Sequence, residues 1–265
     1  MSIKVHPDWW KTLFDDIYLK TDARTVCNEE LSRREVDIIL DLLPVESGHH
    51  IADLCGGQGR HSLELARRGR GECTVVDYSP HLVEVGRSSA RHLNLPVVFV
   101  QGDARETGLP GGRFDYVLIL GNSLGYLPHD DDDGRIMAEA WRLLKPGGHL
   151  LVDVADGDRV LEQMAPNTWH EVDDDLVVCR QREVGDGRVA AREIIFSRRK
   201  GLVRDQSYAI RVYRPGQLKK LVADAGFVEA VIHNDFCSHT GSEDLGFMNM
   251  RTIVTARKPA AVVKQ

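Results

Sequence analysis

The stretch from His50 to Ser62, HIADLCGGQGRHS, constrains the fold of this chain more than any other. Its apolar start, with Asp53 near the end, predicts a buried strand, and the glycines predict a tight loop before a helix that begins at Arg60. Glycines let backbone N–H groups approach a ligand, and the N-terminus of the helix faces the same point. The sequence therefore predicts a strand–loop–helix unit that binds a nucleotide.

Strand and helix patterns alternate on both sides of this unit. A helix is expected over 29–43, and four further strands are expected in ECTVVD, PVVFVQGDA, FDYVLIL and HLLVDVAD, with helical segments between them. After residue 213 a helix, RPGQLKKLVADAGF, precedes the last two strands, VEAVIHNDF and RTIVTARK. This order predicts a Rossmann-like, doubly wound, mostly parallel sheet of seven strands in an α/β fold.

Two segments depart from this pattern. Residues 1–44 have helical spacing from Trp9 to Tyr18 and predict a helical cap, which either packs on the core or forms a lid over a ligand. Residues 167–213 alternate polar and apolar around Gly185-Asp186-Gly187, which predicts a small antiparallel β insertion of three strands. The core is then expected to occupy 45–166, completed by 214–265.

Composition excludes several classes of protein. A net charge of −6 argues against nucleic acid as the partner. The sequence contains no run of 18 apolar residues, so we expect no membrane span. The N-terminus lacks the apolar core of a signal peptide. Five cysteines, odd in number and scattered, predict reduced thiols in a cytoplasmic protein. Four aspartates, Asp130 to Asp133, follow His129, but acids are favoured at a helix N-terminus and we expect no metal there.

The acids at the strand ends indicate which nucleotide the loop holds. The third glycine of a dinucleotide-binding loop is replaced by Ser62, and Asp53 suits an ammonium group better than a diphosphate. Asp77 ends the next strand, where a carboxylate can bind both ribose hydroxyls, and Asp103 ends the third, near an adenine amino group. These three acids fit S-adenosylmethionine, which carries an amine, a diol and an exocyclic amine but no phosphate.

Four motifs in order resemble those of class I S-adenosylmethionine-dependent methyltransferases. They are DLCGGQG, VVDYSP, QGDA and LLKPGGHLLVD, and the resemblance covers roughly 35–258. The loop GNSLGYL and the late RVYRPGQLKKLVADAGF are most similar to small-molecule methyltransferases of this class. Cys55 departs from the pattern, because it stands where the family usually has its first glycine.

The resemblance implies a binding site for S-adenosylmethionine and its product, S-adenosylhomocysteine. Its implied cofactor-binding residues, with Tyr18 of the cap added, are Tyr18, Asp53, Cys55, Gly57, Gly59, Asp77, Tyr78, Asp103, Ala104 and Asn122. The backbone carbonyls of Cys55 and Asn122 are expected to face the methionine amine, and Tyr78 the adenine.

The acceptor is expected to be a small molecule methylated at N, O or S by in-line displacement. Its pocket is expected to include Trp9, Tyr126, Arg211 and Tyr213, and candidate bases are His129, His233, Asp235 and His239. An alcohol acceptor requires a base, an amine must arrive neutral, and a thioether needs none. The motif NPPY of amide- and adenine-methylating enzymes is absent, since Ser123 follows Asn122, and this also disfavours nucleic acid.

Two other functions stay open at this point. The glycine loop and Asp77 are compatible with an NAD(P)-dependent oxidoreductase. Cys55 raises the possibility of a methyltransferase-like binding protein without chemistry. The sequence leaves open whether the protein is a monomer or a homodimer, and which acceptor it binds.

Overall fold

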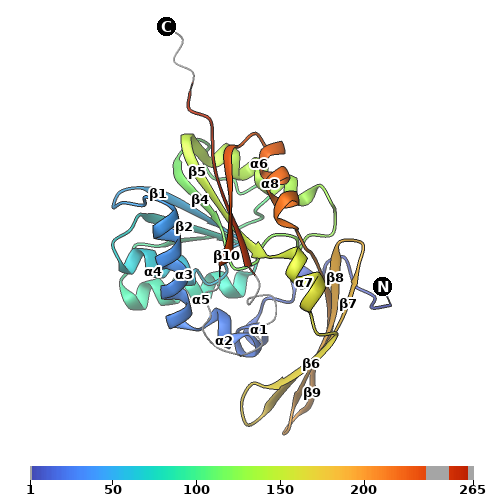
Figure 1. Ribbon diagram of the computed structural model, residues 1–265. Coiled ribbons are helices and arrows are strands. Elements are labelled where there is room, and N and C mark those ends of the chain that lie inside the picture. The colour runs from blue at the N-terminus through green and yellow to red at the C-terminus, as the bar shows by residue number, and fades with distance from the viewer. Residues whose placement is uncertain (1, 237–250, 262–265) are drawn as a thin grey trace.

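Seven strands form one sheet in the computed structural model, which describes residues 2–236 and 251–261 (Figure 1). The strand order is β10-β11-β5-β4-β1-β2-β3, and only β11 runs antiparallel to its neighbours β5 and β10. The bounds are β1 His50–Leu54, β2 Glu72–Asp77, β3 Val98–Gln101, β4 Phe114–Ile119, β5 Leu144–Ala155, β10 Val228–Phe236 and β11 Arg251–Arg257. The Rossmann-like, doubly wound fold predicted from the sequence is confirmed.

Helices cover both faces of this sheet. α3 (Glu29–Leu42), α4 (Arg60–Arg67) and α5 (Pro80–Leu93) lie on one face, and α6 (Asp132–Leu143) and α8 (Pro215–Asp224) lie on the other. Successive strand residues point to opposite faces, so Ile51 packs with α3 and α4 whereas Ala52 packs in the cluster that holds α6 and α8. Burial on both faces explains why these strands are nearly continuously apolar.

Local signals fix where the helices begin. The side chain of Asn28 accepts a hydrogen bond from the backbone of Leu31 at the start of α3. Ser79 caps α5 in the same way through Leu82 N, and Pro80 occupies the first turn. α6 ends at Leu143, and the KPGG segment that follows it lies within β5.

The N-terminal segment is not the continuous helix that the spacing from Trp9 to Tyr18 predicts. A 3₁₀ turn, η1 (Trp9–Lys11), ends at once, and α1 (Asp16–Thr21) and α2 (Ala23–Val26) follow. The carboxylate of Asp15 causes the break, because it accepts hydrogen bonds from the backbone N–H groups of Ile17 and Tyr18 and so starts a new helix.

A second sheet of four antiparallel strands stands to one side of the main sheet (Figure 1). It consists of β6 (Asn167–Glu171), β7 (Leu176–Gly185), β8 (Arg188–Ser197) and β9 (Gly201–Arg211), and α7 (Gly157–Gln163) precedes it. The hairpin at residues 185–187 is confirmed, but β6 is a fourth strand where three were expected. Within the described ranges no helix is both long and apolar enough to cross a membrane.

Candidate functional site

A cavity of about 230 Å³ lies at the carboxyl ends of the parallel strands. The main sheet supplies its floor, and the N-terminal segment and the antiparallel sheet supply the opposite walls. Its lining includes Trp10, Leu13, Phe14, Tyr18, Asp22, Thr25, Val26, Cys55, Gly56, Gly57, Gln58, Arg60, His61, Asp77, Tyr78, Ser79, Leu82, Gly102, Asp103, Ala104, Leu120, Gly121, Asn122, Ser123, Tyr126, Leu127, Ile136, Arg180, Arg182, Glu193, Tyr208 and Ile210. Eight of the ten residues predicted to bind the cofactor are among them: Tyr18, Cys55, Gly57, Asp77, Tyr78, Asp103, Ala104 and Asn122.

The glycine loop after β1 is held close to the sheet. The backbone N–H of Gly59 donates to Gly56 O at 2.8 Å, and Gly59 has a φ of 71°, in the left-handed region. A Cβ atom at Gly59 would lie 2.7 Å from the ring of Phe99, so only glycine fits here. Gly59 therefore starts α4 against the sheet and does not line the cavity.

Asp53 lies beneath the loop and is absent from the cavity wall. Its carboxylate is fully buried and accepts a hydrogen bond from Ser62 Oγ at 2.7 Å, while Oδ1 has no partner among the described residues. Burial raises the pKa of Asp53 to about 7. A Cβ at Gly56 would lie 2.7 Å from this carboxyl group, so Asp53 supports the loop from behind. The structure gives no direct path from Asp53 to a ligand in the cavity.

Asp77, at the end of β2, joins two loops of the cavity floor. Its Oδ2 accepts from Gly57 N and its Oδ1 from Ser79 N, both at 2.8 Å. Burial raises the pKa of this carboxyl group, although both backbone hydrogen bonds oppose the effect. A carboxylate offers about four lone-pair sites, so each oxygen can still accept a bond from a ligand in the cavity.

Cys55 has a φ of 56°, which is the left-handed region that favours glycine. Its carbonyl accepts a hydrogen bond from Ser123 Oγ at 3.2 Å, which ties the glycine loop to the loop after β4. Burial raises the pKa of its thiol well above the ordinary value, so the group stays a neutral thiol. Cys55 therefore adopts the glycine-like dihedral of the residue that it replaces, with backbone strain.

We expect the free energy of unfolding of the Cys55→Gly variant to exceed that of the parent by up to about 1 kcal/mol, because glycine removes that strain. Urea denaturation measures the difference. Cys73→Gly is the matched control, since Cys73 is buried in the middle of β2 and glycine there is expected to destabilise the strand. A loss of stability in Cys55→Gly equal to that in Cys73→Gly would contradict the strain.

Asp103 lines the cavity but is engaged by a neighbouring cation. Arg105 donates to both of its carboxylate oxygens, the shortest contact being 2.6 Å, and also binds Asp132 at 2.8 Å. Burial alone would raise the pKa of Asp103, but the hydrogen bonds from Arg105 lower it overall. The guanidinium of Arg105 lies 5.6 Å from the ring of Trp10, which meets Tyr78 edge-on at 4.5 Å. This group forms one end of the cavity.

The loop after β4 closes the floor between the two ends. Asn122 has a φ of 60° and its side-chain Oδ1 accepts from Ala155 N at 2.9 Å, so the side chain faces β5. Its backbone N–H donates to Asp153 O at 3.1 Å, which turns the loop across the strand ends. The side-chain oxygen of Asn122 is therefore engaged with β5.

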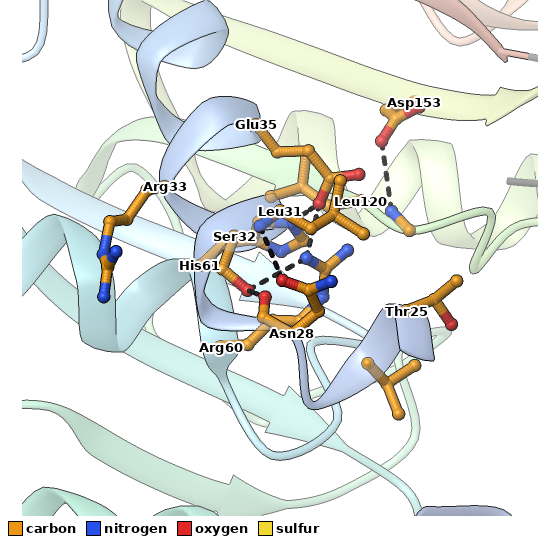
Figure 2. A network of polar contacts seen from close by, with 12 residues as sticks. Thr25, Asn28, Leu31, Ser32, Arg33, Glu35, Arg60, His61, Leu120 and Asp153 are labelled. Carbon is orange, nitrogen blue, oxygen red and sulfur yellow. Dashed lines mark hydrogen bonds and ion pairs between the residues drawn. The ribbon is translucent and has the colours of Figure 1, made fainter. Parts of the chain in front are cut away.

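A buried polar network supports the floor from the side of α3 (Figure 2). Glu35 is 3% exposed and its Oε2 contacts Arg60 Nη1 at 2.5 Å and His61 Nε2 at 2.8 Å. Arg251 lies 3.6 Å from Glu35 and also pairs with Asp153, which accepts from Gly121 N. Burial lowers the pKa of His61 to about 4, so its imidazole is neutral. The network fixes Arg60 and His61, which line the cavity.

The opposite wall combines aromatic rings with charges. Phe14 lies 5.0 Å from Tyr18 and 5.7 Å from Tyr126, measured between ring centroids. On the facing sheet, Arg180 of β7 pairs with Glu193 of β8 at 2.7 Å and with Asp22 at 3.1 Å. The exposed fractions of the Arg180 and Glu193 side chains are 12% and 4%. Arg180, Glu193 and Asp22 are the part of the site that the sequence did not predict.

Several predicted residues lie outside the cavity wall. Trp9 packs behind it, 5.6 Å from the rings of Tyr126 and Tyr208. Arg211 and Tyr213 instead hold Asp133 at the start of α6, because both donate to its Oδ2. The structure therefore places neither of these two residues on the cavity wall.

The two histidines predicted as bases are also away from the cavity lining. His129 lies in the turn before α6, where its carbonyl accepts from Arg211. His233, on β10, contacts Thr255 Oγ1 at 2.8 Å. The side chain of Asp235 and all of His239 fall outside the described residues.

The missed charged residues had one usable signal. In LVVCRQREV the positions 176, 178, 180 and 182 alternate, so Arg180 and Arg182 share the face of the apolar Leu176 and Val178. Arginines on an otherwise apolar strand face need an acidic partner or a ligand. The partner could not be named, because Arg180 and Glu193 become neighbours only through the β7–β8 register.

Comparison with known proteins gives one family match. The family model described as "Methyltransferase domain" matches residues 51–148. YqeM of Bacillus subtilis, named as a methyltransferase, is 31% identical over 140 residues, which are 53% of this chain and 56% of that protein. A demethylmenaquinone methyltransferase of Listeria welshimeri is 33% identical over 114 residues, which are 42% and 47% of the two chains. The chain thus matches about half the length of these curated relatives.

A solved structure shares the fold over nearly the whole chain. An S-adenosylmethionine-dependent methyltransferase from Clostridium acetobutylicum superposes with a TM-score of 0.71 at 16% identity, covering 92% of this chain and 97% of that one. Identity at this level shows the fold alone. The family match and the fold agree with the resemblance carried by the four sequence motifs.

Proposed function

We propose that this chain is a class I, S-adenosylmethionine-dependent methyltransferase that methylates a small-molecule N, O or S acceptor in its cavity. The match of residues 51–148 to the methyltransferase domain and the shared fold support this proposal. The observation that carries the proposal is Asp77, whose two oxygens each keep room for one more hydrogen bond beside the glycine loop. A ribose diol supplies those two donors.

The polar and aromatic groups of the cavity floor fit S-adenosylmethionine along the length of that molecule. Asp77 would hold the ribose, Tyr78 and Trp10 would border the adenine, and Gly102 to Ala104 would lie along its edge. The carbonyls of Cys55 and Asn122 would accept hydrogen bonds from the methionine amine. Arg60, which also lines the cavity, would bind the methionine carboxylate. When bound, S-adenosylmethionine supplies an activated methyl group on a sulfonium.

The chain's own contribution is alignment and exclusion of water. The N-terminal segment covers the cavity and is tied to the core at two points, by Ser79 Oγ to Phe14 O at 2.6 Å and by Gln58 Nε2 to Val26 O at 2.7 Å. Holding donor and acceptor in line in a closed site lowers the barrier for displacement. We keep the cytoplasmic location in this proposal, because none of the four described cysteines forms a disulfide.

Calorimetry with the full chain tests the proposal. We expect S-adenosylhomocysteine to bind to the protein and NADH to leave the heat signal unchanged. Tight NADH binding without S-adenosylhomocysteine binding would reject the methyltransferase assignment in favour of a nicotinamide enzyme. Formation of S-adenosylhomocysteine from S-adenosylmethionine in a metabolite screen would separate an enzyme from a binding protein.

A further inference from the structure

We propose that the acceptor is an amine, which binds between the aromatic wall and the carboxylates of Glu193 and Asp22, with Glu193 as the group that takes its proton. This inference rests on the proposed function, because it names the substrate class of the same cavity. The proposed acceptor site lies at the wall formed by the antiparallel sheet, which contains none of the four sequence motifs assigned to the methyl donor.

Glu193 is the central observation. It is 3% exposed, it lies on the cavity wall, and its Oε2 accepts from Arg180 Nε at 2.7 Å. Its second oxygen, Oε1, accepts no hydrogen bond from a described residue. This oxygen is not among the fully buried atoms without a partner, so on the cavity wall it is open to a cationic or donating ligand group.

The charges around Glu193 favour a cation over an anion. The cluster holds two carboxylates, Glu193 and Asp22, against one guanidinium, Arg180. Both oxygens of Asp22 contact Arg180 Nη2 at 3.1 Å, so the positive charge is already engaged on two sides. Arg182 of β7 also lines the cavity, but its side chain is turned to Ala165 O and Thr168 Oγ1, to which it donates. Within the ion-paired group of Glu193, Asp22 and Arg180 the formal charges sum to −1, which an ammonium group neutralises.

Aromatic faces give a second, independent reason. Tyr126, Tyr208 and Phe14 surround the same space, with Trp9 behind them at 5.6 Å from each of the two tyrosine rings. Faces of aromatic rings attract cations, and the attraction grows when the site excludes water. Burial raises the pKa of Tyr208 to about 12, so its ring stays a neutral phenol. Aromatic rings beside carboxylates are a combination that suits an ammonium group.

Glu193 is also suited to remove a proton. Burial raises the pKa of its carboxyl group, although Arg180 opposes the effect. Glu193 therefore accepts a proton more readily than an exposed glutamate does. The ammonium gives one N–H proton to the carboxylate, and the nitrogen lone pair then forms the new N–C bond. The C–S bond would break with its electron pair left on sulfur, the product would leave as the methylated ammonium, and protonated Glu193 would release its proton to solvent.

Titration calorimetry on the full chain saturated with S-adenosylhomocysteine tests the substrate class. The probes are phenethylamine, phenethyl alcohol and phenylacetate, extended to a panel of small amines each paired with its alcohol and carboxylate. We expect amines to bind about 10- to 100-fold more tightly than their matched alcohols, because a charge-assisted hydrogen bond to Glu193 is lost in the alcohol. Carboxylates are expected to bind most weakly.

The variant Glu193→Gln is expected to lose this preference for amines while binding S-adenosylhomocysteine as the parent does. Asp205→Asn is the matched control, since Asp205 forms an ion pair with Arg192 on the exposed face of the same sheet. It is expected to keep the amine preference. Should Glu193→Gln fail to fold, Asp22→Asn provides the same comparison with the second carboxylate.

Two sets of results would overturn the inference. One is that no amine binds better than its alcohol or carboxylate, and the other is that Glu193→Gln keeps the full amine preference. The failure of the proposed function gives a different result, namely no binding of S-adenosylhomocysteine in the first titration. The amine titrations are repeated without S-adenosylhomocysteine, so the two failures can be told apart.

Discussion

Replacing Asp77 by Asn is expected to weaken the binding of S-adenosylhomocysteine about 100-fold, as measured by titration calorimetry. The substitution removes the charge that would strengthen hydrogen bonds from both ribose hydroxyls. It also places an amide N–H₂ against the N–H of Gly57 or of Ser79, which now donate to the carboxylate at 2.8 Å. Two donors facing each other would loosen the floor of the cavity.

Asp115→Asn is the control for this result. Asp115 also accepts a backbone hydrogen bond, from His50 N at 2.8 Å. It lies at the start of β4, at the amino-terminal ends of the parallel strands and away from the cavity. We expect Asp115→Asn to bind S-adenosylhomocysteine with the affinity of the parent. Equal affinities for the Asp77 and Asp115 variants would show that the β2 carboxylate does not hold the ligand.

The cofactor half of the site could be predicted because its residues follow strand ends. Asp77 ends β2, and Asp103 and Asn122 follow within three residues of the ends of β3 and β4, so all three lie where the carboxyl ends of the parallel strands meet. Their location needs only the order of strands along the chain. Asp53 shows the limit of this reasoning, since a residue inside β1 faces the space under the loop and not the cavity.

The acceptor half of the site could not be predicted. Its contacts depend on the register of β7 with β8 and on the packing of the N-terminal segment against that sheet. Arg180 meets Glu193 only through the pairing of β7 with β8, and it meets Asp22 only because the N-terminal segment lies against that sheet. The sequence predicts Arg211 and Tyr213 in the acceptor pocket. In the fold they face α6, where Asp133 has no exposed side-chain surface and requires their hydrogen bonds.

Replacing Glu35 by Gln is expected to lower the free energy of unfolding by about 3–5 kcal/mol, because it leaves two buried arginines with less negative charge. Arg251 is fully buried, and burial lowers its pKa to about 10, which shows how much the cation depends on its partners. Urea denaturation at neutral pH measures the loss. Glu30→Gln, on the same helix, is the control, since its ion pairs with Arg33 and Arg34 are exposed and are expected to contribute less than about 1 kcal/mol.

The pH dependence distinguishes this electrostatic cause from a packing defect. Burial would raise the pKa of Glu35, but the charges of Arg60 and Arg251 and the hydrogen bond from His61 lower it well below its ordinary value of 4.5. A depressed pKa means that the stabilisation is present above pH 4.5 and is lost as the pH falls further. The gap between the parent and Glu35→Gln should therefore shrink below pH 4.5. A gap that stays constant down to acidic pH would show that Glu35 stabilises the fold through its shape and not through its charge.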